Sequence, residues 1–174
     1  MNKQGRDTAD KTKHLTLMAM LFALSIVLSI VEGLLPAPTA APGIKLGLSN
    51  IVVMFTLINL KKSDALIIAF LKAGFALLTR GMVAGILSLS GGLASVLIML
   101  LLMGLLGKKT SYLGLSVSGA VFHNLGQITV ASFILKTSLW YYFPILLISA
   151  IGSGFLTSVL LRQSAPLLKR LNLK

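Results

Sequence analysis

The stretch Pro42-Gly43-Ile44-Lys45-Leu46-Gly47-Leu48-Ser49-Asn50 stands where a Pro-rich linker gives way to an apolar run that continues to Leu60. Pro42 and Gly43 stop regular structure, and the run that follows is long enough to cross most of a bilayer. We therefore expect Lys45 where hydrocarbon meets water, at the rim of an outward-facing site that can receive an anion. The alternative is a Lys that only anchors the helix end by extending its ammonium group to the interface.

The composition of the whole chain indicates an integral membrane protein. Of its 174 residues, 56% are hydrophobic and 11% are charged, and the mean hydropathy is +0.93. These values lie far outside the mix of a soluble domain. The net charge of +12 does not predict a nucleic-acid partner, because the cations lie at the ends of apolar runs and not among aromatic residues. The chain has no cysteine, so it has no disulfide, no thiolate nucleophile and no Cys-ligated metal.

The apolar runs predict an all-α membrane protein with six transmembrane helices. The expected helices span about residues 15–31, 44–60, 64–79, 81–106, 112–135 and 140–161. Polar tails at 1–13 and 163–174 flank this single membrane domain, which covers 14–162. The fourth helix is too long for one straight crossing, so we expect either a break at Gly91–Gly92 or first turns outside the hydrocarbon.

The positions of Lys and Arg orient these helices. Twelve of the cations lie on one side of the membrane: four in the N-terminal tail, two each in the turns at 61–62 and 108–109, and four at the C-terminal end from Arg162 onward. Three others, Lys45, Arg80 and Lys136, lie on the opposite side. Because short cytoplasmic segments carry the excess of Lys and Arg, both termini are predicted to be cytoplasmic.

The loop at 34–43 is predicted to face outside and to act as a lid. It holds three of the five prolines and cannot be helical. Glu32 precedes this loop at the end of the first predicted helix. We expect this carboxylate to be a solvated helix end, or the partner of a nearby cation, rather than a catalytic acid.

Two cations of the third predicted helix are candidates for solute binding. Lys72 falls in the middle of the helix, where an unpaired cation would cost about 2.5–3.5 kcal/mol on the insertion scale. Ala69, Lys72, Ala76 and Arg80 follow one another at steps of three and four residues, which gives a slanted stripe that leads toward the outer surface. We therefore expect Lys72 to face a cavity or a partner, and Arg80 either to bind the solute or to anchor the helix end.

The fifth predicted helix contains a polar cluster, His123, Asn124 and Gln127. His123 and Gln127 are one turn apart and Asn124 lies beside them, so all three are expected to face one sector of the helix. With Lys72 on another helix, this cluster predicts a binding site. The alternative is interhelical hydrogen bonding, worth about 0.6 kcal/mol per contact. A metal site is not expected, because the only other histidine is His14 in the N-terminal tail.

Ala19 and Ala23 lie four residues apart on one face of the first predicted helix. Small residues at this spacing allow another helix to approach closely, which is how helices associate in lipid. The pattern predicts either packing within this protein or docking on a separate subunit.

Four motifs in order along the chain carry a family resemblance. They are PGIKLGLSNI at 42–51, Ser-Gly-Gly at 90–92, the Lys-Lys turn at 108–109 and SGAVFHNLGQ at 118–127. With them, nearly the whole chain resembles the Gx transporter family, often labelled heptaprenyl diphosphate synthase component I. PGxKLGLxN followed by HNxxQ in a six-span protein is a fairly specific combination.

The resemblance implies a fold and a set of partners. The family is similar to the substrate-binding S components of energy-coupling-factor transporters, which form a six-helix bundle with a ligand pocket near the outer surface of the bacterial plasma membrane. In those proteins an AxxxA face of the first helix docks on a transmembrane coupling subunit that sits on two ATPases, and Ala19 and Ala23 fit that pattern. Asn50, the last residue of the PGxKLGLxN pattern, is also expected to bind the solute.

The residues argue against an enzyme. Prenyl chain elongation needs magnesium held by clustered carboxylates, and the four acidic residues include no pair within the predicted membrane region. The chain also lacks a GxxxxGK[ST] loop, so active uptake would require a separate ATPase.

The sequence therefore predicts a subunit without cofactors that captures a small anionic or amphipathic solute at the outer face. The family label and an expected apolar lining suggest an isoprenoid or quinone precursor, or a vitamin-like solute. The alternative is a non-catalytic membrane subunit of heptaprenyl diphosphate synthase.

Overall fold

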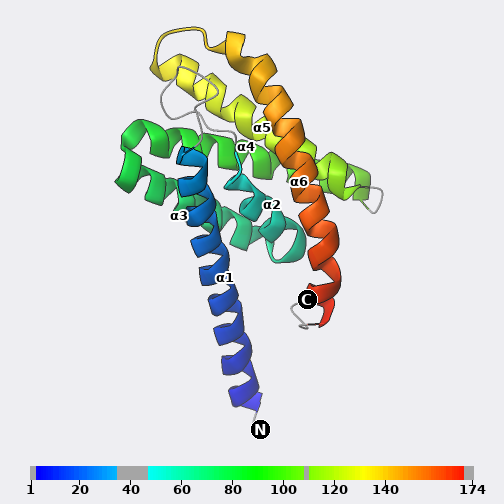
Figure 1. Ribbon diagram of the computed structural model, residues 1–174. Helices are drawn as coiled ribbons and strands as arrows, with labels where there is room; N and C mark the ends of the chain where they lie inside the picture. The colour runs from blue at the N-terminus through cyan, green and yellow to red at the C-terminus, as the bar shows by residue number, and fades with distance from the viewer. Residues whose placement is uncertain (1–2, 35–46, 108–109, 171–174) are drawn as a thin grey trace.

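The computed structural model describes residues 3–34, 47–107 and 110–170, and within these ranges all regular structure is helical (Figure 1). The all-α prediction is thus confirmed for the described part of the chain. The elements in order are α1 (Lys3–Leu34), α2 (Asn50–Asn59), α3 (Lys62–Arg80), α4 (Met82–Leu106), α5 (Tyr112–Ile134), the short 3-10 helix η2 (Trp140–Tyr142) and α6 (Phe143–Arg170).

Helix α1 begins at Lys3, so most of the segment predicted as a polar tail is the first part of a continuous 32-residue helix. Side-chain hydroxyls in this part bond within the helix: Thr12 donates to the carbonyl of Thr8, and Thr16 to that of Thr12. Nε2 of His14 also lies 3.4 Å from Oδ1 of Asp64 on α3. These contacts give polar side chains partners without breaking the helix, which is why the change of polarity near Leu15 does not mark a helix start.

Helix α2 is much shorter than the run predicted at 44–60. It has 10 residues and begins at Asn50, after a turn in which the N–H of Asn50 donates to the carbonyl of Gly47 at 2.9 Å. Gly47 has φ of +89°, a backbone conformation that favours glycine. Ten helical residues extend over about 15 Å, half of the hydrocarbon thickness. Helix α2 therefore cannot cross a bilayer by itself.

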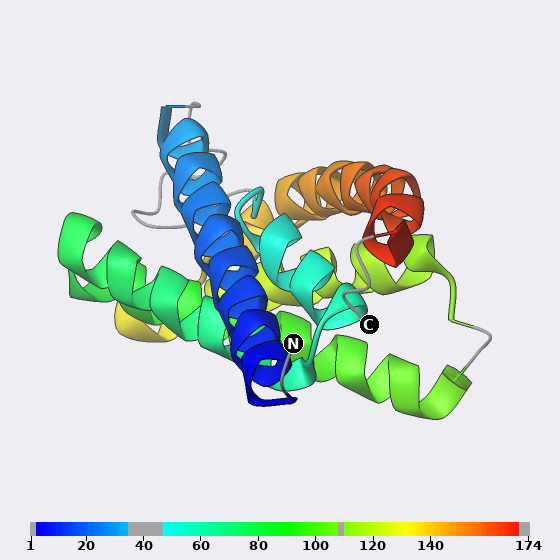
Figure 2. The same ribbon diagram turned by 90° about the horizontal axis from the view of Figure 1, so that it is seen from below.

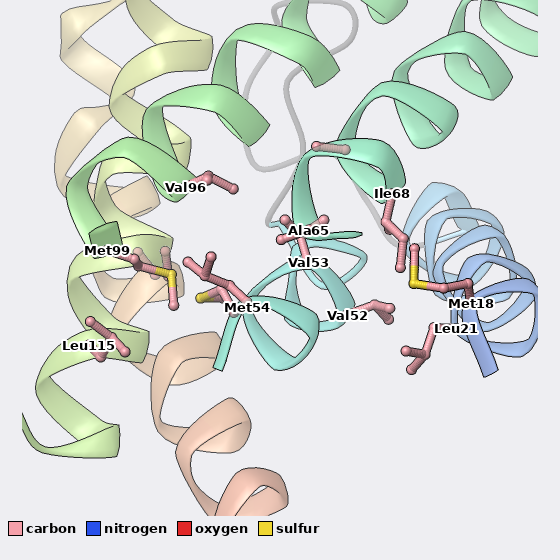
Figure 3. Packing of buried hydrophobic residues seen from close by; sticks show 14 residues of the cluster. Met18, Leu21, Val52, Val53, Met54, Ala65, Ile68, Val96, Met99 and Leu115 are labelled. Carbon is pink, nitrogen blue, oxygen red and sulfur yellow. The ribbon is translucent and has the colours of Figure 1, made fainter. Parts of the chain in front are cut away.

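Helix α2 lies at the centre of the hydrophobic core and touches every other α-helix. Figure 3 shows Val52, Val53 and Met54 of α2 between side chains of the surrounding helices. Met18 and Leu21 of α1 pack on one side and Met99 on the other. The other labelled core residues come from α3, α4 and α5: Ala65, Ile68, Val96 and Leu115.

The longer helices surround α2. Helix α4 packs extensively against α3 and α5, and α5 packs in turn against α6. Helix α1 contacts α2 and α3, and Figures 1 and 2 both show it on the side of α2 opposite to α6. The beginning of α1 and the end of α6 lie toward the same side of the molecule (Figure 1).

Three of the described helices are long and apolar enough to cross a membrane, at Thr8–Leu34, Met82–Leu106 and Trp140–Gln163. Large apolar side chains are exposed on several helices, among them Leu78 (84%), Phe133 (86%) and Ile148 (73%). Exposing such apolar surfaces to water costs free energy, whereas contact with lipid does not. These features indicate a membrane-embedded protein, and the count of six spans with cytoplasmic termini stays a prediction.

Helix α4 is continuous from Met82 to Leu106 and does not break at Gly91–Gly92. The glycines instead allow close packing: a Cβ at Gly91 would lie 2.8 Å from atoms of the His123 ring on α5. The Ser-Gly-Gly motif is therefore a contact between helices rather than a helix end.

Candidate functional site

A polar pocket lies where α1, the turn before α2, α3, α4 and α5 meet. Its empty volume is about 270 Å³, including the part open to solvent. The lining residues are Ser29, Glu32, Ser49, Lys72, Arg80, Ala84, Ser88, His123 and Gln127. Ala84 alone among them has an apolar side chain, so the lining is polar and the expectation of an apolar one is wrong.

Helix α3 supplies both cations of this pocket. Lys72 and Arg80 are eight residues apart, which is close to two full turns, so they share a face. Lys72 is 2% exposed, as predicted for a mid-helix cation that faces a cavity. Arg80 is exposed, and its Nη2 donates to Oγ of Ser29 on α1 at 3.0 Å. The pocket therefore has one cation inside and one near solvent.

Helix α1 supplies a carboxylate. Glu32 is 4% exposed, so the expectation of a solvated helix end is wrong. Its Oε1 accepts hydrogen bonds from the N–H groups of Gly47 and Leu48, the latter at 3.3 Å. Its Oε2 is buried and has no hydrogen-bond partner among the described residues. The charge of Arg80 interacts with that of Glu32, which fits the other expectation, a partner for a nearby cation.

Helix α5 supplies an imidazole and an amide. His123 and Gln127, one turn apart, are both buried in the pocket wall and share a hydrogen bond of 2.9 Å between Nε2 atoms. Two close approaches hold the His123 ring in place, because a Cβ at Gly91 would lie 2.8 Å from it and one at Gly47 would lie 3.1 Å from it. Of the predicted polar cluster, His123 and Gln127 therefore line the pocket, whereas Asn124 does not.

The two asparagines predicted to bind solute form interhelical hydrogen bonds and do not line the pocket. Nδ2 of Asn124 donates to the carbonyl of Leu146 on α6 at 2.9 Å. Nδ2 of Asn50 donates to Oγ of Ser95 on α4, also at 2.9 Å. For Asn124 this was the stated alternative, and it follows from the 100° that separates successive residues around a helix.

Two predicted residues, Ala19 and Ala23, do not line the pocket. Ala19 and Ala23 are exposed on α1, so they do not pack against the described part of this chain. Of the predicted lid at 34–43, Leu34 is the last residue of α1, so the expectation that this residue is not helical is wrong. Lys45 and residues 35–43 lie outside the described residues. Within the described residues, no other helix covers the face of α1 that carries Ala19 and Ala23.

Sequence reasoning missed several lining residues, Ser29, Glu32, Ser49, Ala84 and Ser88. A signal existed for α1: Ser25, Ser29 and Glu32 are spaced by four and three residues, and all three are buried. A polar stripe on an otherwise apolar helix indicates a face that avoids lipid. Within the described residues, no group of three His, Cys, Asp or Glu side chains could hold a metal ion.

A comparison with models of protein families found a match for most of this chain. The family model described as heptaprenyl diphosphate synthase component I matches residues 21–164, a range that includes every lining residue of the pocket. No curated protein and no solved structure matched the chain. Because the family model matches most of the 174 residues, the protein belongs to the heptaprenyl diphosphate synthase component I family.

Proposed function

We propose that this protein is the substrate-binding subunit of an energy-coupling-factor uptake transporter and captures a small anionic solute. The observation that carries the proposal is the convergence of Lys72 and Arg80 on one pocket. A buried cation inside a membrane protein is costly, and such residues commonly mark a ligand pathway. The anion would gain Coulomb energy from both cations in a partly water-excluded site.

The lining favours a hydrophilic solute. Hydroxyls of Ser29, Ser49 and Ser88, with the amide of Gln127, offer hydrogen bonds around the two cations. A carboxylate or phosphate of low molecular weight fits this pocket better than an isoprenoid chain.

Energy for uptake would come from partner proteins. The chain has no phosphate-binding loop of its own. Exposed Ala19 and Ala23 on α1 offer a surface of small residues where a coupling subunit with its two ATPases can dock. In this scheme capture occurs at the outer face of the membrane, and the partner drives reorientation and release inside.

A second candidate is a non-catalytic membrane subunit of heptaprenyl diphosphate synthase. The description of the family favours it. In that case the polar pocket would bind the anionic diphosphate end of a product, with the exposed apolar helix surfaces in contact with its chain.

Gentle purification of the tagged protein from native membranes tests the proposal, with mass spectrometry of the proteins and small molecules that accompany it. A coupling subunit, two ATPases and a retained anion are the expected result. A prenyl synthase subunit without ATPases would overturn it in favour of the second candidate. Replacing Lys72 and His123 together should abolish uptake of the retained solute, and unchanged uptake would exclude this pocket as its site.

A further inference from the structure

Glu32 distinguishes this pocket from a simple anion site. Lys72 and Arg80 can only donate hydrogen bonds, whereas hydroxyls, the amide and the imidazole can adapt to either role. An ionised carboxylate can only accept. Among the described lining residues, Glu32 is therefore the one side chain that requires a donor.

The two oxygens of Glu32 have different surroundings. The N–H groups of Gly47 and Leu48 bond to Oε1 and hold the carboxylate in place. Oε2 is buried without a hydrogen-bond partner in the described structure. Leaving a buried charged oxygen without a partner is costly, and a donor that arrives with a ligand would remove that cost.

The formal charges of the pocket agree with a ligand of mixed character. Lys72 and Arg80 against Glu32 leave one excess positive charge. A plain anion would gain from the two cations but would lie near a carboxylate that repels it. An anion that also carries an N–H or O–H donor is attracted by the two cations and can bond to the carboxylate.

We propose that Glu32 Oε2 is a selectivity element that admits anions bearing a hydroxyl or ammonium donor in preference to anions without one. This inference rests on the proposed solute-binding function and specifies the class of its ligand. The anionic group lies toward Lys72 and Arg80, and the donor bonds to Oε2 of Glu32.

The Glu32→Gln variant isolates this oxygen. The glutamine carbonyl can keep the bonds from Gly47 and Leu48, while an NH₂ donor replaces Oε2 and the side-chain volume is unchanged. Asp64→Asn is the matched control, because Asp64 is also a buried carboxylate, 5% exposed, and does not line the pocket. Both variants remove one negative charge.

The test measures binding of two ligand pairs to the purified full-length protein at millimolar concentration: lactate against propionate, and aspartate against succinate. Each pair differs by one donor group. Wild type and Asp64→Asn should share the same ratio of affinities within each pair. In Glu32→Gln that ratio should shift against the donor-bearing member by about tenfold, the size of one hydrogen bond to a charged group.

The possible results distinguish a failure of the role of Glu32 from a failure of anion binding by the pocket. One outcome is that anions bind, that Lys72→Gln weakens their binding, and that the affinity ratios are equal in wild type and Glu32→Gln. This result would overturn the role of Glu32 and leave the anion pocket supported. If none of the four ligands binds, the anion pocket and this inference both fail. Should Glu32→Gln not fold, Glu32→Asp, which withdraws the carboxylate by one methylene, must shift the ratios in the same direction.

Discussion

Arg80 at the end of α3 donates a hydrogen bond of 3.0 Å to Ser29 of α1. Ser29 lies one turn before Glu32, so the same face of α1 contacts a cation of the pocket and supplies its carboxylate. A solute that bonds to Arg80 therefore acts on a side chain that already joins α1 to α3.

Replacing Ser29 with Ala should weaken binding of the solute by about fivefold. The change removes the acceptor that positions the Arg80 guanidinium, and part of the usual energy of a charged hydrogen bond is lost to solvent because Arg80 is exposed. Titration calorimetry with the anion retained from native membranes measures the effect. Ser90→Ala is the control, because Ser90 donates only to the carbonyl of Leu87 and lies outside the lining. Equal affinities for the two variants would contradict a positioning role for Ser29.

Gly91→Ala should lower both thermal stability and solute affinity, whereas Gly92→Ala should change little. A Cβ at position 91 would lie 2.8 Å from the His123 ring and 2.9 Å from Cγ of Gln127, while one at position 92 meets Cβ of Ala69 at 3.4 Å. Overpacking of this kind costs about 1–3 kcal/mol. Thermal unfolding in detergent and a binding titration report the two effects, and similar behaviour of the two variants would count against the packing described for His123.

Asn124→Ala should reduce stability and spare affinity, whereas Gln127→Ala should reduce affinity. Asn124 bonds to the carbonyl of Leu146 and does not line the pocket, whereas Gln127 lies in the wall. Hydrogen bonds between membrane helices contribute about 0.6 kcal/mol on average and at most about 1.7. Thermal unfolding in detergent measures the stability of each variant, and a binding titration measures its affinity. A loss of affinity in Asn124→Ala without a loss of stability would contradict the structural role of Asn124 and indicate that it binds the solute.

Replacing Ala19 and Ala23 together with Leu should leave solute binding intact and remove the ATPase partners from the purified complex. Both alanines are exposed on α1, and larger side chains would prevent close approach of a partner helix. Met20→Leu, a change of nearly constant volume at the next exposed position, should retain the partners. Quantitative mass spectrometry of the two preparations makes the comparison, and undiminished ATPases in the double variant would rule out docking at this face.

Lys72, His123 and Gln127 show what the sequence could predict about the site. A cation in the middle of an apolar helix, or a polar pair at a spacing of four, must avoid lipid, and spacing alone then indicates a shared face. Asn124 shows the limit of this reasoning, since an adjacent residue points about 100° away and finds its partner on a different helix.

Glu32 and α2 could not be predicted in the same way. The partners of Glu32 are main-chain N–H groups of a turn that begins at Gly47, and no side-chain pattern encodes them. The run at 44–60 was predicted as a span because hydropathy measures removal from water and does not distinguish burial in lipid from burial among other helices. Helix α2 is buried by protein.

Gly47 has a consequence for how new specificities can arise in this fold. Its N–H donates to Glu32, and a Cβ on it would lie 3.1 Å from the His123 ring, so main chain supports two lining residues here and any side chain at this position is strained. Mutation cannot vary such a support gradually. Ala84 and Ser88 of α4, small and one turn apart, are the lining positions where stepwise enlargement can reshape the pocket. Diversification of the recognised solute should therefore proceed mainly through α4, while the Gly47 turn stays constant.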